Sequence, residues 1–211
     1  LLDPAARAEA SALLLLDPQF TRLYHERHAP NVDEASLRAF PNGSLGHQLL
    51  AFRSHYQLTE NFFPIGVTLD AKTTPLDYAV YLLNSLHDLI HVVCQYDISD
   101  ADEVAIESFL LAQLPIPLAL FVQYCLAHPE IHIARYKHLR DMGAAYISWP
   151  DYDRGGRAET LAFANLDRRL GESVTSLRRE LNVAKREHQV AFINTCGLPD
   201  TGSFWRAEPP R

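Results

Sequence analysis

Residues 75–96 constrain the fold of this chain most strongly, because their apolar and polar side chains separate onto two faces of one long helix. At 100° per residue, one face carries leucines and a valine: Leu82, Leu86, Leu89 and Val93. The opposite face carries a row of polar side chains: Asp77, Tyr81, Asn84, Asp88, His91 and Gln95. The pattern predicts a helix that is buried on its apolar face.

The rest of the chain has the same helical character, and no segment shows the apolar–polar alternation of a β-strand. Helices are predicted over residues 4–17, 18–28, 33–40, 44–57, 101–127 and 128–143, and as a pair over 157–190. Loops are predicted at 59–74 and 149–156, and a tail at 197–211. The sequence therefore predicts an all-α, single-domain helical bundle over residues 1–211. The bundle is built around the long buried helix and an antiparallel partner at 101–127.

Composition narrows the class of protein. The 211 residues are 47% hydrophobic and 21% charged, which excludes a disordered chain. A net charge of −7 argues against a nucleic-acid partner. Three cysteines without metal-knuckle spacing indicate reduced thiols and an intracellular protein. The longest apolar runs fall short of the roughly 20 residues that span a bilayer.

The polar row on residues 75–96 is unusual in its residue types. A helix face in water usually carries Lys, Glu or Arg, and this row has none of them. Short polar groups that form hydrogen bonds while half-buried suit the lining of a cavity. Tyr81, Asn84 and Gln95 are therefore candidates to bind a polar head group, with an ordinary solvated face as the alternative.

His87 and His91 are spaced i,i+4, which places two imidazoles on one helix face within reach of a single ion. Asp88 lies between them, and Glu103 lies in the first turn of the next predicted helix. In an antiparallel hairpin His91 and Glu103 stand at matching levels, so these groups can converge on one divalent cation. Glu103 has an alternative role in a capping box with Asp100. Glu107, one turn further, is either a surface group or a contact near the ligands, and it joins Tyr81, Asn84 and Gln95 as a candidate substrate contact.

These residues resemble the signature His-Asp-x2-His-x11-Glu of the coenzyme Q biosynthesis protein 4 family. Eleven residues separate His91 from Glu103, as in that signature. Residues 40–46 (FPNGSLG) are similar to the family's entry to an early helix. Residues 107–115 resemble the helix after the ligand glutamate, and residues 177–181 (LRREL) resemble a late Leu-Arg-x-x-Leu segment.

The resemblance implies a ligand set of His87, Asp88, His91 and Glu103 around one divalent ion. Zinc is the usual assignment, and iron, cobalt, manganese or magnesium are alternatives. It also implies a hydrophobic tunnel for the isoprenoid tail of a quinone precursor, a homodimer, a biosynthetic complex and peripheral association with a membrane. In eukaryotes that membrane is the matrix side of the inner mitochondrial membrane. The implied reaction is removal of the C1 carboxylate of a prenylated hydroxybenzoate, coupled to hydroxylation there.

The chain departs from the family pattern beside the signature. Family members carry arginines and a glutamate just before the His-Asp pair, whereas residues 81–86 contain no charged residue. Asp102 stands where glycine is common, and Glu107 where a lysine is frequent. We therefore expect this chain to share the family's metal site, and we expect its substrate to match the family's less closely.

Two other functions fit parts of the pattern. A metal-dependent phosphohydrolase of the HD type would join His87 and Asp88 with His55 and with Asp97 or Asp100, but it leaves His91 and Glu103 unexplained. A non-catalytic isoprenoid-binding scaffold would use the metal for structure alone. A late basic cluster (Arg178, Arg179, Lys185 and Arg186) is predicted to be a solvated helix face.

Overall fold

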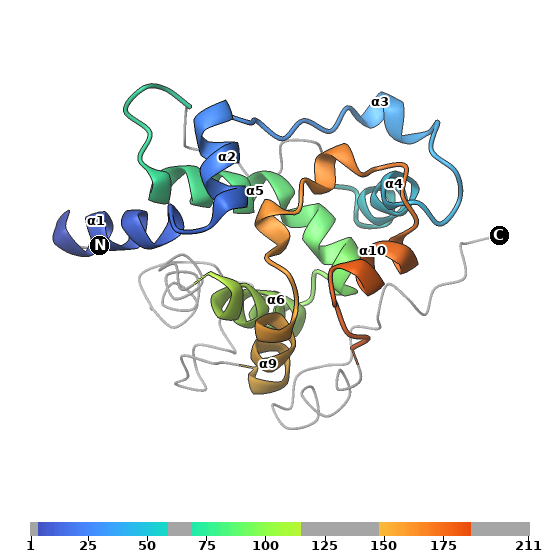
Figure 1. Ribbon diagram of the computed structural model, residues 1–211. Coiled ribbons are helices and arrows are strands. Elements are labelled where there is room, and N and C mark those ends of the chain that lie inside the picture. Colours follow the sequence, from blue (N-terminus) through green and yellow to red (C-terminus); the bar gives the residue numbers. More distant parts are fainter. Residues whose placement is uncertain (1–3, 59–68, 115–147, 187–211) are drawn as a thin grey trace. The chain divides into compact units, whose positions relative to one another are not determined.

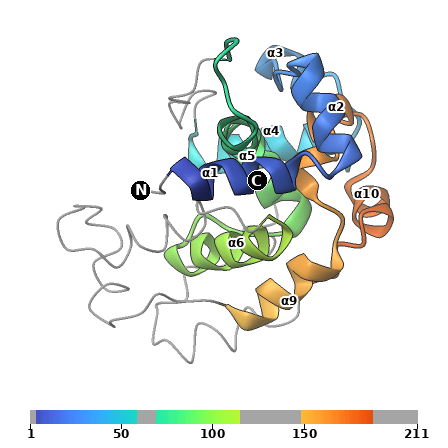
Figure 2. The same cartoon turned by 60° about the vertical axis from the view of Figure 1, so that its left-hand side comes forward.

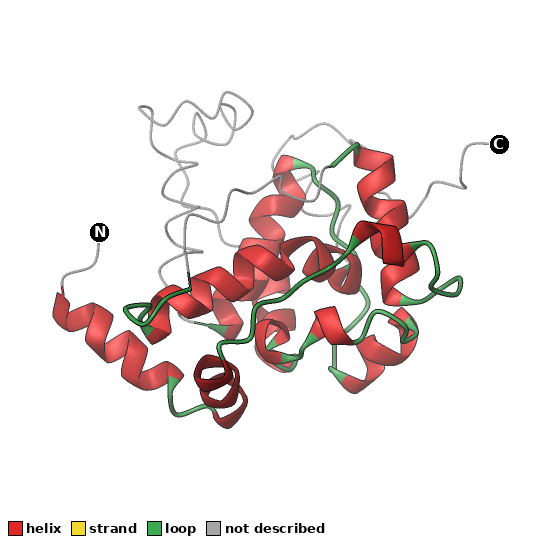
Figure 3. Cartoon of the chain, turned by 90° about the horizontal axis from the view of Figure 1, so that it is seen from above, coloured by secondary structure: helices red, strands yellow, loops and turns green. Residues whose placement is uncertain are grey.

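The computed structural model describes residues 4–58, 69–114 and 148–186 (Figure 1). The described residues form helices joined by loops, without a β-strand (Figure 3). One isolated antiparallel bridge joins Ser44 and Ser173. The predicted all-α fold class is confirmed.

The first four helices begin within one residue of the starts that the sequence predicts. They are α1 (Pro4–Leu14), α2 (Pro18–Glu26), α3 (Glu34–Leu37) and α4 (Leu45–Tyr56). The side chains of Asp17, Asp33 and Ser44 each accept a hydrogen bond from a backbone N–H of the first turn that follows. Helix α4 ends at Gln57, whose φ of 55° turns the chain out of the helix.

The long helix α5 (Pro75–Cys94) is also confirmed, and its apolar face is buried. It ends at Gln95, where φ is 63°. After a short link, α6 (Asp100–Gln113) begins behind Ser99. The predicted continuation of this helix to residue 127, the loop at 59–68 and the helix at 128–143 lie outside the described residues.

Two predictions for the last third of the chain were wrong. Residues 149–156 form a helix, α9 (Trp149–Arg157), despite the two glycines at its end. Residues 157–186 form 3₁₀ turns (η2, Leu161–Phe163; η3, Leu166–Arg168) and the short helix α10 (Val174–Glu180) rather than a long pair. Asn165 and Asn182 adopt left-handed φ values of 52°, which breaks a continuous helix at both places.

The chain divides into two compact units, so the prediction of a single domain stays a prediction. The first comprises residues 1–90 and 160–176. In its core the Phe20 ring lies 5.8 Å from that of Tyr78 and 5.0 Å from that of Phe163. The buried Tyr78 hydroxyl donates to the carbonyl oxygens of Leu23 and His28, at 2.9 and 2.7 Å.

The second unit comprises residues 91–159 and 177–211, and in its described part α9 lies along α6 (Figure 2). Gly155 makes this packing close. A Cβ atom at Gly155 would stand 2.2 Å from the carbonyl oxygen of Phe109, so only glycine allows the two backbones to meet here. This contact explains why a glycine occupies the interior of α9.

Among the described residues, no helix has both the length and the apolar composition that crossing a bilayer requires.

Candidate metal centre

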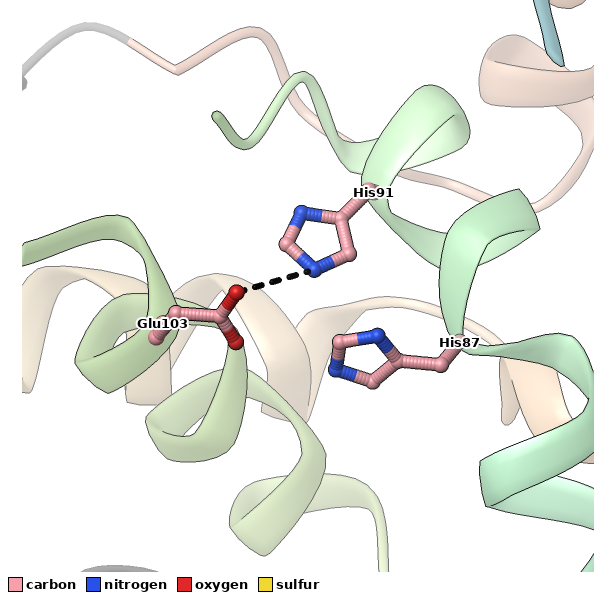
Figure 4. A group of neighbouring side chains, drawn as sticks. All are labelled: His87, His91 and Glu103. Carbon is pink, nitrogen blue, oxygen red and sulfur yellow. Dashed lines mark ion pairs between the residues drawn. The ribbon is translucent and has the colours of Figure 1, made fainter. Parts of the chain in front are cut away.

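Three of the predicted ligands come together in the structure. His87, His91 and Glu103 each offer one nitrogen or oxygen atom, and these atoms all lie within 4.8 Å of one another. Figure 4 shows both imidazoles projecting from α5 toward the Glu103 carboxylate on α6. The arrangement is a two-histidine, one-carboxylate donor set of the kind that binds divalent transition metals.

The backbone fixes which nitrogen of His91 faces Glu103. His91 is 1% exposed, and its Nδ1 lies 3.4 Å from the carbonyl oxygen of Tyr96, an acceptor to which Nδ1 can only donate. Nε2 then carries the lone pair in the neutral ring, and it lies 3.8 Å from Oε1 of Glu103. Two electron-rich atoms, Nε2 of His91 and Oε1 of Glu103, therefore face each other. Their approach is favourable when Nε2 carries a second ring proton or when a cation lies between the two atoms.

His87 lies one turn before His91 on the same helix and is half-buried. Burial lowers the pKa of His87, and the neighbouring Asp88 carboxylate opposes that shift. Neutral imidazole is the form that donates a lone pair to a metal, so burial favours the ligating form.

The first turn of α6 shows that Glu103 does not cap this helix. The N-cap is Ser99, whose hydroxyl accepts a 3.2 Å hydrogen bond from the N–H of Asp102. Asp102 therefore occupies the third helical position, and its carboxylate accepts from the N–H of Asp97 at 2.6 Å. The alternative in which Glu103 forms a capping box with Asp100 therefore does not hold, because the N-cap is Ser99.

Asp88 does not join the group of three. Its Oδ2 accepts a 2.8 Å hydrogen bond from Nε of Arg53, on the last turn of α4, and the two side chains form an ion pair. The HD-type alternative gains no support from the structure either, because the group contains neither His55 nor Asp97.

The candidate substrate contacts lie on α5, α6 and the link between them. Tyr81, Asn84 and Gln95 are half-buried, and their role toward a polar head group stays a prediction. Glu107 is 7% exposed, and this burial raises the pKa of its carboxyl to about 7. It lies one turn beyond Glu103 on the same side of α6.

A buried network that the sequence analysis missed holds the link between α5 and α6. The Tyr96 hydroxyl donates to Asp151 and accepts from Arg154, both at 2.8 Å. Arg186 pairs with the fully buried Asp102 at 2.5 Å and lies 4.8 Å over the Tyr96 ring. The only sequence signal was a run of charged residues after Ser148, which resembled a polar loop.

Arginines also satisfy the last carbonyl groups of α5. Arg178 donates to the carbonyl oxygens of Val93 and Val92, at 2.7 and 2.9 Å, and Arg154 donates to that of Cys94. The predicted solvated basic face is therefore correct for Arg179 and Lys185, which are exposed, and wrong for Arg178 and Arg186. These contacts fix the end of α5 that carries His91.

Comparison with known proteins assigns the chain to a family. The sequence matches the family of coenzyme Q (ubiquinone) biosynthesis protein Coq4 over residues 12–187. The chain belongs to this family. The match extends over both compact units and contains all four residues of the signature.

Two Coq4 relatives are similar at a low level of identity. The mitochondrial ubiquinone biosynthesis protein COQ4 homolog of Danio rerio is 25% identical over 170 residues, which is 79% of this chain and 60% of that protein. COQ4 homolog 1 of Culex quinquefasciatus is 25% identical over 152 residues, 72% of this chain and 52% of that protein. The chain thus spans between half and two thirds of the length of these curated relatives.

A solved structure shares the Coq4-like fold. The crystal structure of a proposed ubiquinone biosynthesis protein from Nostoc punctiforme has a TM-score of 0.62 and 23% sequence identity, and the match covers 85% of this chain and 82% of that one. At this identity the likeness establishes the fold.

Proposed function

We propose that this chain is a divergent Coq4 protein that acts in ubiquinone biosynthesis on a prenylated aromatic ring, with one divalent metal ion held by His87, His91 and Glu103. The grouping of these three donors within 4.8 Å carries the proposal. Membership of a ubiquinone biosynthesis family supports a prenylated aromatic substrate.

The donor set fits a small divalent ion. Ligand atoms of a tetrahedral site with bonds near 2.1 Å lie roughly 3.4 Å apart, so a spread of 4.8 Å closes through modest side-chain rotations. Two imidazoles and one carboxylate leave coordination positions open, as catalytic sites do. Asp88 is available as a fourth ligand only if its ion pair with Arg53 opens.

The reaction proposed is the one the family resemblance implies, oxidative removal of the ring carboxylate at C1. The bond from C1 to the carboxyl carbon breaks and carbon dioxide leaves. The new hydroxyl oxygen comes from dioxygen, whose second oxygen leaves as water after an external reductant supplies two electrons. A bound metal would supply Lewis-acid or redox chemistry. Tyr81, Asn84 and Gln95 orient the ring's polar groups, and Glu107 exchanges protons near neutral pH.

We also propose a homodimer that associates peripherally with a membrane and with other enzymes of the same biosynthesis. The names of the two relatives, which call them mitochondrial, support a mitochondrial place of action in a eukaryote.

Metal analysis together with turnover tests the proposal. Purified protein should hold about one divalent ion per chain by mass spectrometry of the metals, and the double variant His87→Ala/His91→Ala should lose it. His25→Ala, which changes an exposed histidine of α2, is the matched control. Loaded protein should convert a short-chain prenylated hydroxybenzoate, given dioxygen and a reductant, and Glu103→Ala should not.

Two results would contradict the proposal in different ways. Metal retained in the double variant would show that the ion binds elsewhere. Stoichiometric metal without turnover, in protein that still binds the prenylated acid, would favour the non-catalytic scaffold.

A further inference from the structure

Arg53 occupies a position where the helix pattern requires an apolar side chain. Leu45, Leu49 and Phe52 form the buried face of α4, and Arg53 follows them at the spacing i, i+4, i+7, i+8. Arg53 is only 8% exposed. Because arginine is almost never buried unless its charge is paired, the position calls for a reason.

The Asp88 carboxylate pairs with one side of the Arg53 guanidinium. The Arg53–Asp88 contact is a single hydrogen bond from Nε, at 2.8 Å, rather than the two parallel bonds that a guanidinium and a carboxylate form when they meet side on. The Nη1 atom of Arg53 is buried and has no hydrogen-bond partner in the described part of the chain. Two N–H groups of a buried cation are therefore without an acceptor.

We infer that Nη1 of Arg53 binds the carboxylate of an aromatic acid, and that Arg53 selects the acid over its neutral analogues. A carboxylate supplies the charged acceptor that Nη1 lacks. A carboxylate suits the site better than a phosphate dianion, because the guanidinium has a single positive charge that it already shares with Asp88, and a dianion would leave more negative charge unpaired. The inference rests on the proposed function only for the identity of the acid.

Arg53 contacts α5 next to the candidate metal centre. Asp88 directly follows His87 in α5, so the guanidinium meets this helix beside a proposed ligand. Residues 81–86, which precede the His-Asp pair, contain no cation. Arg53 thus brings from α4 a cationic hydrogen-bond donor, Nη1, that this stretch of α5 does not provide.

Binding measurements without turnover test the inference. A short-chain prenylated hydroxybenzoate, its methyl ester and the corresponding phenol are titrated into metal-free protein, so that no metal ion holds the carboxylate. The wild type should bind the acid roughly tenfold or more tightly than the ester or the phenol, as expected for a charge-assisted hydrogen bond. Arg53→Met/Asp88→Asn should reduce the difference to within about twofold, and Arg53→Lys should retain part of it.

The double change removes both charges together, which a fold tolerates better than one buried unpaired charge. Arg22→Met, at an exposed position of α2, is the control and should keep the wild-type preference. An acid preference that persists in the double variant, or that is absent from the wild type, overturns the inference. Loss of metal or turnover with the Arg53-dependent preference intact would instead overturn the proposed function alone.

Discussion

Nε2 of His91 lies 3.8 Å from Oε1 of Glu103, although twelve positions separate the two residues in the sequence. The contact joins the last turn of α5 to the first turn of α6. A hydrogen bond from Nδ1 to the Tyr96 carbonyl directs the ring, and the Ser99 cap sets the register of α6. The distance between His91 and Glu103 is therefore set by the five-residue link (residues 95–99) at least as much as by the two helices.

Glu103→Gln should weaken metal binding by roughly 100-fold or more, because the amide lacks the negative charge that a divalent ion requires. Competition with a chromophoric chelator measures the change. Glu159→Gln alters an exposed glutamate of the same unit and should leave the affinity unchanged. An equal affinity in Glu103→Gln and wild type would remove Glu103 from the ligand set.

Glu107→Gln should stabilise the metal-free protein in a pH-dependent way. The folded pKa of about 7 exceeds the ordinary value of 4.5, so the folded carboxyl keeps a proton that the unfolded chain has lost. Wild-type stability therefore falls as pH rises from about 4.5 to about 7. The stability difference between variant and wild type should grow by about 3 kcal/mol over that window and then stay constant.

Urea unfolding at pH 4, 6 and 8 measures this difference, and Glu159→Gln should show no such trend. A constant difference across the three pH values would mean that the Glu107 carboxyl ionises normally in the folded protein.

Tyr96→Phe should destabilise the protein by about 1–3 kcal/mol, because Asp151 and Arg154 lose a buried hydrogen-bond partner. Metal affinity should fall as well, since Tyr96 belongs to the link between His91 and Glu103. Tyr152→Phe, at an exposed tyrosine of α9, is the control for both measurements. If Tyr96→Phe unfolds at the wild-type urea concentration, the network contributes little to stability.

Two adjacent glycines of α9 should respond to alanine in opposite directions. Gly155→Ala forces a Cβ to within 2.2 Å of the Phe109 carbonyl oxygen and should cost about 3 kcal/mol. At Gly156 the nearest atom would be the Cβ of Ala112 at 4.0 Å, so alanine should stabilise the helix by up to about 1 kcal/mol. Thermal melts of both variants give the comparison, and equal melting temperatures would contradict the packing of α6 on α9.

The sequence alone determined most of what depends on neighbouring residues. Helix periodicity predicted the helical class and the starts of α2, α3 and α4 to within one residue, since such signals act within one turn. In the structure Asp17, Asp33 and Ser44 cap these three helices. The i,i+4 spacing placed His87 and His91 together for the same reason. The fixed spacing to Glu103 added the family and the third donor.

Only the tertiary structure decided the features that join residues far apart in the sequence. Position 155 requires glycine because the α6 backbone lies against it, and Asp88 faces Arg53 from another helix. The buried roles of Arg178 and Arg186 depend on carbonyl and carboxylate partners about 85 residues away. Local sequence indicates that a side chain is charged, but the environment that buries or pairs that charge comes from packing.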